Sequence, residues 1–552
     1  MRTLRNIVAV AAAMAIGLVN STVSYSQTPA KPVAIVSIAP LDRLMQDFTY
    51  LTRSSGVPQV GGFGSMLTKQ YTQGLDTTRP AGITVQLVDN QPVAIAFLPL
   101  KDRQQFFSAL AGANLTPDDL GDGVFAFDAN GRAIYAKDAG KWLFISQQED
   151  SLKNLPADPS AALGNLPTKY DVATRIKVQA LPAELRTMAV NQMRAGFERS
   201  LAEQRDQTAE EKAAAEEVGK STIEQMERLI NETDEVLLGW SATAATQKVQ
   251  IDMGAQFVEG SELASQVGKL QNLTSDHTGL LIQGAALTLR STSLIMESDK
   301  AIAKNNLRNA YSQVEKQIDD SGSLPGENKE ALKKFAKGMI DIVEKTIDTG
   351  KLDGGGAVAL NENKVRAVFG GAVADGMLVE KQVKDLVASL GSGPHIPKFQ
   401  FNYAKHQNVN LHKVSIPLKT DDASVQKIFG SELRLVLGTG AQSFFISLDP
   451  DGDSVIRAAL DRIAAAKNVK VTPGEFILEV GQVLNFAQTL APNPILDNAA
   501  QMVQQSEGKD KIRVLSTVVP RGVEYQVTVD EGVLKGIGAA VQAGQGGGGA
   551  GF

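Results

Sequence analysis

Cysteine is absent from the 552 residues of this chain. Its absence excludes disulfides, thiolate metal ligands, a thiol nucleophile and a lipidated cysteine. Tryptophan and histidine are scarce, at two and four residues, so we expect neither an aromatic platform for carbohydrate nor an imidazole-based zinc site. Hydrophobic packing must therefore stabilise the protein. A chain of this length should form at least two domains, because single cores stop growing near ~250–300 residues.

Charge of one sign is not in large excess either. The formal net charge is −6 and the isoelectric point is about 5.5. Proteins that bind nucleic acid carry a basic face, so no nucleic-acid partner is expected, and anionic membrane surfaces are a poor match. The sequence also lacks the G-x-S-x-G pattern of a serine-hydrolase elbow. We predict no catalytic residue and no cofactor.

No hydrophobic run reaches the roughly 20 residues needed to cross a bilayer. The apolar segment Ile7–Val19 follows Arg2 and Arg5 and precedes small residues, which is the order of a secretory signal. We therefore expect a signal peptide over residues 1–26, or a cut after Ala30, and export to the periplasm or the extracellular space. No integral membrane segment is expected after cleavage. An uncleaved membrane anchor is the competing interpretation.

A module of strand, turn and amphipathic helix occurs four times. In each copy the strand alternates apolar and polar residues, a polar or glycine turn follows, and the helix has apolar residues three and four apart. The copies are Pro92–Ala111, Lys248–Leu270, Lys364–Leu386 and Gly522–Val541. A strand and one or two helices precede each copy, so the repeated unit is predicted to be strand–helix–helix–hairpin–helix.

The units alternate long, short, long, short, as one duplication of a two-unit domain would leave them. The predicted class is α+β, with two similar domains, each an antiparallel sheet covered by helices on one face. A disordered glycine-rich tail should follow them. The predicted ranges are 30–275 for the first domain (units 33–155 and 172–271), 279–543 for the second (units 283–466 and 474–541) and 544–552 for the tail.

Residues 449–453 (DPDGD) place carboxylates at alternate positions, as a calcium loop does. An EF-hand also needs glycine at its sixth and glutamate at its twelfth position; here these are Ser454 and Leu460. The competing interpretation is a turn whose last aspartate caps the following helix. The weak calcium candidates are Asp449, Asp451 and Asp453.

Two other features are interpreted as structural. His406 and His412 lie about 20 Å apart if the strand is continuous, although a turn at Gln407-Asn408 would shorten this distance, and we expect both to face solvent. Ser54–Ser65 is rich in glycine and is predicted to be a loop. Gating of a cleft is the functional alternative for this loop.

The segment VAIAFLPLKDRQQFFSAL (residues 93–110), the signal sequence, the lack of cysteine and the glycine tail give a layout that resembles large exported proteins of unknown function from bacteria such as planctomycetes. This resemblance implies no catalytic residues. The first hypothesis is a non-enzymatic exported binding or structural protein with a protein partner.

Two alternatives remain open. One is a carrier of an apolar ligand such as a lipid, which needs a cavity in the sheet and helices. The other is a hydrolase with an unmarked carboxylate site, which needs two acids facing one cleft, one of them with a raised pKa. The residues expected to line the carrier's cavity are Phe401, Val409, Leu411 and Ile416.

Overall fold

The computed structural model describes residues 32–112, 115–129, 131–203, 209–322, 325–361, 364–390, 397–418, 423–491 and 493–546. Helices and antiparallel strands alternate along them, which confirms the α+β class. The predicted signal peptide lies outside the described residues. The chain divides into two compact units: unit 1 is Met1–Glu203, Thr222–Ala264 and Pro520–Gln542, and unit 2 is Gln204–Ser221, Ser265–Val519 and Ala543–Phe552.

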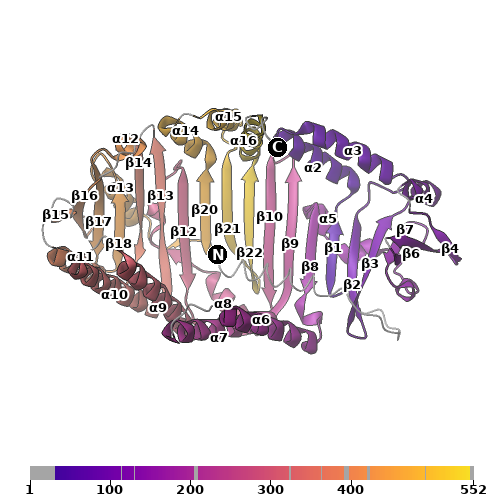
Figure 1. The fold of residues 1–552 in the computed structure, drawn as a ribbon, viewed down its shortest axis with the longest axis horizontal. Helices are drawn as coiled ribbons and strands as arrows, with labels where there is room; N and C mark the ends of the chain where they lie inside the picture. The colour runs from indigo at the N-terminus through magenta and orange to yellow at the C-terminus, as the bar shows by residue number, and fades with distance from the viewer. Residues whose placement is uncertain are drawn as a thin grey trace. The chain divides into compact units, whose positions relative to one another are not determined.

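The strands of unit 1 pair in the order β4-β5-β6-β7-β3-β2-β1-β8-β9-β10-β22, and each pair is antiparallel (Figure 1). The last partner, β22, comes from the C-terminal part of the chain. The strands are β1 (Ala34–Ile38), β2 (Ala81–Val88), β3 (Gln91–Pro99), β4 (Asp118–Gly121), β5 (Val124–Ala129), β6 (Arg132–Asp138), β7 (Trp142–Ser146), β8 (Val172–Lys177), β9 (Thr233–Thr243), β10 (Lys248–Phe257) and β22 (Gly522–Asp530).

The strands of unit 2 pair in the order β15-β16-β17-β18-β14-β13-β12-β20-β21, again antiparallel throughout. They are β12 (Leu287–Leu294), β13 (Lys351–Asn361), β14 (Lys364–Ala372), β15 (Lys398–His406), β16 (Val409–Pro417), β17 (Glu432–Gly440), β18 (Ser443–Leu448), β20 (Gly474–Glu479) and β21 (Lys511–Val519). A separate two-stranded pair joins β11 (Thr274–Ser275) to β19 (Val469–Lys470).

The strand and the closing helix of each of the four predicted modules are present. In unit 2, α9, α10 and α11 run along one end of the strands, and α14 and α15 lie at the other end (Figure 1). The helices are α2 (Leu41–Ser54), α3 (Pro58–Tyr71), α4 (Arg103–Ala111), α5 (Leu166–Lys169), α6 (Ala183–Glu203), α7 (Ala209–Glu232), α8 (Glu262–Leu270), α9 (Glu297–Asp320), α10 (Gly326–Asp348), α11 (Gly376–Leu390), α12 (Ala423–Phe429), α13 (Ser454–Ala465), α14 (Val480–Leu490), α15 (Pro494–Gln504) and α16 (Glu531–Gly546).

Helix α16 extends to Gly546, three residues into the range predicted as a disordered tail. These three residues are Gly544, Gln545 and Gly546, and glycine has a low helix propensity, so composition did not predict the extension. Residues 547–552 of the predicted tail lie outside the described part of the chain.

The glycine-rich segment Ser54–Ser65 was predicted to be a loop, and this is wrong: Pro58–Tyr71 forms helix α3. Glycine serves close packing here. A Cβ on Gly61 would lie 2.3 Å from the Thr52 hydroxyl, and a Cβ on Gly64 would lie 2.5 Å from the Phe48 ring, both on α2. The two helices therefore approach one another closely along a glycine face, and the gating alternative has no loop to act through.

Aromatic residues dominate the core of unit 1. Trp142 is 1% exposed and meets Phe97 edge to face, with ring centroids 5.7 Å apart. Phe144 lies directly across from Phe97 on the neighbouring strand and is equally buried. The guanidinium of Arg79 lies 4.1 Å from the centroid of the Trp142 ring, so this end of the sheet is filled by stacked side chains.

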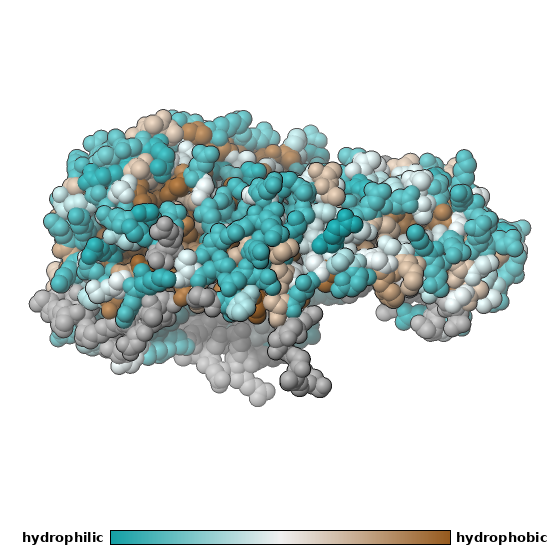
Figure 2. Space-filling view, turned by 90° about the horizontal axis from the view of Figure 1, so that it is seen from above, coloured by the Kyte–Doolittle hydropathy of each residue, from teal (hydrophilic) through white to brown (hydrophobic). Residues whose placement is uncertain are grey.

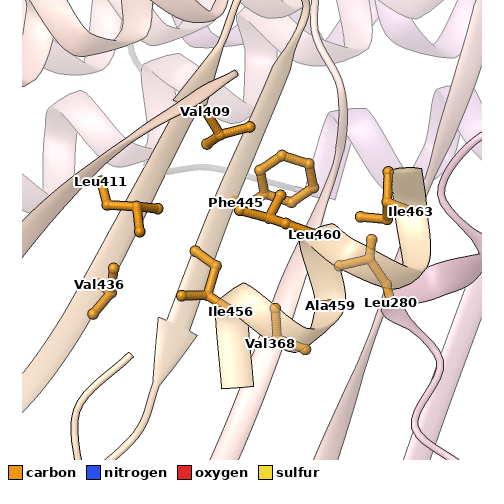
Figure 3. Packing of buried hydrophobic residues seen from close by; sticks show 10 residues of the cluster. All are labelled: Leu280, Val368, Val409, Leu411, Val436, Phe445, Ile456, Ala459, Leu460 and Ile463. Carbon is orange, nitrogen blue, oxygen red and sulfur yellow. The ribbon is translucent and has the colours of Figure 1, made fainter. Parts of the chain in front are cut away.

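Helix α13 packs on β14 and β18 and forms the main core of unit 2 (Figure 3). Its apolar residues recur at a spacing of three and four, which places them on one helix face. They meet alternate residues of the strands, because alternate positions share a face of the sheet. The buried cluster consists of Leu280, Val368, Val409, Leu411, Val436, Phe445, Ile456, Ala459, Leu460 and Ile463.

The opposite face of the same strands is covered as well, by α11. A sheet with one covered face was predicted, and His412 was expected to face solvent, but His412 is 2% exposed beneath α11. The reason lies in its polar neighbours: Glu380 of α11 accepts hydrogen bonds from Asn410 and from Thr439 at 3.1 and 2.8 Å. A polar strand face can therefore be buried when a helix supplies a matching carboxylate.

Hydrophilic residues make up most of the face seen in Figure 2, with hydrophobic residues in small groups between them. Within the described residues, no helix combines the length and the apolar character needed to span a bilayer.

Candidate functional site

A cavity of about 650 Å³ lies in unit 2, on the α13 side of the sheet, where β13, β14, β16 and β18 come together near the end of α13. Polar groups line its mouth and apolar groups its floor. The lining residues are Asp276, His277, Thr346, Thr349, Lys351, Asp353, Ala372, Val373, Ala374, Gln407, Asn408, Val409, Gln442, Ser443, Phe445, Leu460, Ile463, Ala464 and Lys467.

A buried carboxylate, Asp353, organises one wall of this cavity. Its Oδ2 accepts the backbone N–H of Asp276 at 2.9 Å and lies 3.1 Å from Nδ1 of His277. Its Oδ1 accepts the hydroxyl of Thr292 at 3.0 Å. The Asp353 side chain is only 2% exposed, so these donors replace the water that the carboxylate loses on folding.

The pKa of Asp353 reflects two opposing effects. Burial raises it, but the hydrogen bonds from His277, Ser275 and the Asp276 N–H outweigh burial and bring the pKa well below its ordinary value. The carboxylate is therefore ionised at neutral pH and can only accept hydrogen bonds.

That ionised carboxylate fixes the tautomer of His277. Nδ1 must carry the proton that points to Asp353, so Nε2 of the neutral ring has a free lone pair. The side chain is 9% exposed. Among the described residues Nε2 has no hydrogen-bond partner, and it is not one of the buried polar atoms left unsatisfied. We conclude that Nε2 opens to the cavity as a hydrogen-bond acceptor.

The sheet register explains why Asp353 and Ser443 share this site. Gly354, Gly371 and Phe444 form one row across β13, β14 and β18. Asp353 and Ser443 each precede a member of that row, so both point to the α13 face. The Ser443 hydroxyl lies against Gly440 in the adjoining turn. Beneath them, Val409, Phe445, Leu460 and Ile463 belong both to the buried cluster and to the cavity floor (Figure 3).

His412, in contrast, has both nitrogens occupied. Nδ1 accepts the N–H of Asn402 at 3.1 Å, and Nε2 lies 2.9 Å from the Thr439 hydroxyl. Burial lowers the pKa of this ring. Burial also raises the pKa of Glu380, but the hydrogen bonds from Lys384, Asn410, Thr439 and Asn402 dominate and lower it to about 2. This closed network joins α11 to the sheet and leaves no group free for a ligand.

The three calcium candidates lie together after β18, but each is held by protein groups. Asp449 accepts the N–H of Asp451, the Ser454 hydroxyl and the N–H of Val455, and thus caps α13 in place of the predicted Asp453. Asp451 pairs with Lys364 and Arg366, and Asp453 with Arg457 and Tyr403. These hydrogen bonds to cations lower the pKa of Asp451 and Asp453. No cluster of three metal-ligating side chains occurs in the part of the chain that the structure describes.

The residues expected to line an apolar carrier cavity are not brought together. Val409 lines the cavity, and Leu411 is packed in the buried cluster. Phe401 lies on the other face of the sheet, edge to face with His412 at 5.7 Å. Ile416 is half-buried near the end of β16.

Nε2 of His406 lies 2.7 Å from the Asp461 carboxylate of α13. The predicted turn at Gln407-Asn408 is present, and both of its residues have a positive φ angle. The fourth histidine, His395, lies outside the described residues.

The hydrolase alternative asked for two neighbouring acids, and unit 1 contains such a pair. Burial, followed by the nearby Asp171 carboxylate, raises the pKa of Asp47 to about 6. Asp171 is fully buried and pairs with Arg43 at 2.9 Å. The cavity beside Tyr50 in unit 1, of about 560 Å³, is lined by neither carboxyl group.

Sequence reasoning missed the His277–Asp353 pair because the two residues are 76 positions apart. One signal was present: the charged residue Asp353 directly precedes Gly354-Gly355-Gly356 in the sequence. A charge in a glycine-rich strand suggests a buried group with specific partners. No protein-family model, curated protein or solved structure matches this chain.

Proposed function

We propose that this chain is an exported binding protein in which unit 2 takes up a small organic molecule. One observation carries the proposal: His277 is buried and oriented by Asp353, while its Nε2 faces a cavity of about 650 Å³ without a partner among the described residues. Pockets of this volume with a few convergent polar groups are typical of small-molecule sites.

We also propose that the two units arose by duplication. From β4 to β9 in unit 1 and from β15 to β21 in unit 2, the pairing orders have the same connectivity. Side chains correspond too: the hydroxyl of Ser146 donates to the carbonyl of Ala94 at 3.0 Å, and that of Ser447 donates to the carbonyl of Ala367 at 2.9 Å. The phenylalanine two residues earlier is buried in both units.

This correspondence explains how the cavity formed. The place of Trp142 in unit 1 is taken by Ser443 in unit 2, and the place of Phe97 is taken by Gly370. In unit 1 the two aromatic rings fill the space. In unit 2 Ser443 lines the cavity, while the Phe445 ring packs against Gly370 and leaves no room for a side chain there. The small side chain of Ser443 at the position of Trp142 supports a binding role that is specific to unit 2.

Diethyl pyrocarbonate, which modifies unprotonated imidazole nitrogens, tests the proposal. Mass spectrometry of the native protein should find His277 modified and His412 unmodified, because only His277 has an unpaired nitrogen at a cavity. Ser443→Trp should reduce the modification of His277 by about tenfold, since the indole refills the space occupied in unit 1.

Binding is measured by adding neutral, anionic and cationic small molecules one at a time and testing whether each protects His277 from modification by diethyl pyrocarbonate. Protection by at least one charge class, absent in Ser443→Trp, supports the proposal. The proposal is wrong if His277 reacts only after unfolding, or if no member of the panel slows its modification.

A further inference from the structure

The charged side chains around the cavity mouth differ in whether other groups of the protein already bind them. Two carboxylates and two ammonium groups line it. Asp353 is saturated by its buried donors, and Asp276 Oδ1 accepts the N–H of Asn468 at 2.8 Å. The nearest carboxylate oxygen to Lys351 Nζ is 4.0 Å away and already bonded. Lys467 is exposed and has no ion pair among the described residues.

The negative charges are therefore committed to the protein, and the positive charges remain available to a ligand. A carboxylate or another small anion at the mouth would gain charge-assisted hydrogen bonds from Lys351 and Lys467. Such an anion loses less hydration at the mouth than it would in a buried site, so the pairing is not offset by a large desolvation cost.

The other polar groups of the lining, among them the buried His277 and the exposed Asn408 and Gln442, suit hydroxyls. His277 Nε2 accepts a hydrogen bond and needs an O–H or N–H donor from the ligand. Ser443 can donate or accept, and the side-chain amides of Asn408 and Gln442 supply both functions. A fully apolar ligand would leave Nε2 of the buried His277 without a hydrogen-bond donor.

Apolar surface is also present in the lining, and Val409 and Phe445 contribute to it. It matches the C–H faces of a carbon chain or ring that carries hydroxyls on its other side. Resting on the proposed binding function, we infer that the ligand is a small polyhydroxylated carboxylate, of the sugar-acid class. Its carboxylate pairs with the two lysines, and its hydroxyls meet His277 and the amides.

Three six-carbon probes separate the two parts of this inference. Gluconate carries a carboxylate and hydroxyls, hexanoate carries the carboxylate alone, and sorbitol carries the hydroxyls alone. Isothermal titration calorimetry on the full chain should give gluconate a Kd about tenfold or more below that of either control, since each contact type contributes at least about 1.4 kcal/mol.

Single substitutions test which residue binds the carboxylate of the ligand and which binds its hydroxyls. Lys467→Gln should remove the preference for gluconate over sorbitol, while Lys470→Gln, an exposed lysine outside the cavity, should preserve it. His277→Gln should reduce the preference for gluconate over hexanoate. Hydrogen exchange of β13 checks that each variant is folded.

The outcomes are distinct from those of the protection experiment. If some panel compound protects His277 but gluconate binds no better than hexanoate or sorbitol, the sugar-acid inference is refuted and the binding function stands. If gluconate shows no binding at millimolar concentration, the inference is also refuted. Loss of all protection refutes the binding function itself.

Discussion

Replacing the Asp353 carboxylate should destabilise unit 2 by an amount that depends on which donors lose their partner. In Asp353→Asn the amide oxygen can still accept from the Asp276 N–H and from His277, and the amide nitrogen can donate to the Thr292 hydroxyl. The three hydrogen bonds remain, but they are made to a neutral amide instead of an ionised carboxylate. A hydrogen bond to a charged group contributes roughly 1 kcal/mol more than a neutral one, so the expected loss is about 2–3 kcal/mol.

Asp353→Leu should cost more, although the two side chains have the same number of heavy atoms. It leaves a backbone N–H and the Nδ1–H of His277 buried without acceptors, at about 1–3 kcal/mol each, in addition to the lost bonds. We expect about 4–6 kcal/mol in total. Asp276→Asn is the matched control, because its amide oxygen can keep the single bond to Asn468, and its change should stay within about 0.5 kcal/mol.

The assay must resolve the units. Both tryptophans, Trp142 and Trp240, belong to unit 1, so fluorescence reports on that unit alone. Hydrogen exchange of peptides from β12 and β13 under increasing urea reports on unit 2. The reasoning would be refuted if Asp353→Asn matched the Asp276→Asn control, or if Asp353→Leu proved no more destabilising than Asp353→Asn. Acid should also weaken unit 2, because a lowered carboxyl pKa stabilises the fold above the unfolded value near 3.8 and this contribution is lost as pH falls.

Three further predictions concern features outside the cavity. Burial and the nearby Asp171 raise the pKa of Asp47 from 3.8 to about 6, so unit 1 should lose about 2 kcal/mol of stability as pH rises from 4 to 7. Asp47→Asn should flatten this dependence in fluorescence-detected urea unfolding, and an unchanged slope would contradict it. In α3, Gly64→Ala should lower the unfolding free energy by about 1 kcal/mol through overpacking, whereas Gly62→Ala, which meets nothing within 4 Å, should raise it by about 0.5–1 kcal/mol; equal effects would refute the close helix contact. Millimolar calcium should leave the melting temperature within about 1 °C because cations of the protein already pair with residues 449–453, and a larger rise would show that the loop binds calcium.

Periodicity was sufficient to place most elements. Alternating residues located the strands of the four modules, and apolar residues three and four apart located their closing helices α4, α8, α11 and α16. The glycine-rich segment of α3 failed because glycine near another helix serves close approach, while in sequence it is the signal of a turn. Local composition does not distinguish these uses without knowledge of the facing surface.

The candidate site was less accessible to sequence reasoning than the fold. His412 was placed in solvent because its strand face is polar, yet that face is buried under Glu380 of α11. His277 and Asp353 meet only through the pairing of β12 with β13 and the position of the preceding segment. The burial of His412 and the contact between His277 and Asp353 both depend on how distant strands pair, and the residue types alone do not show this register.

The pairing of β10 with β22 has a consequence for biosynthesis. Residues Lys248–Gln256 pair with Gly522–Asp530, so the sheet of unit 1 gains this strand only after the stretch Ser265–Val519 of unit 2 has been made. Until then β10 presents an open edge, the feature that natural sheets protect against pairing with other chains. Unit 2, drawn mainly from the continuous stretch Ser265–Val519, has all its paired strands earlier. Products terminated before residue 520 lack β22 and would therefore aggregate through the open edge of β10.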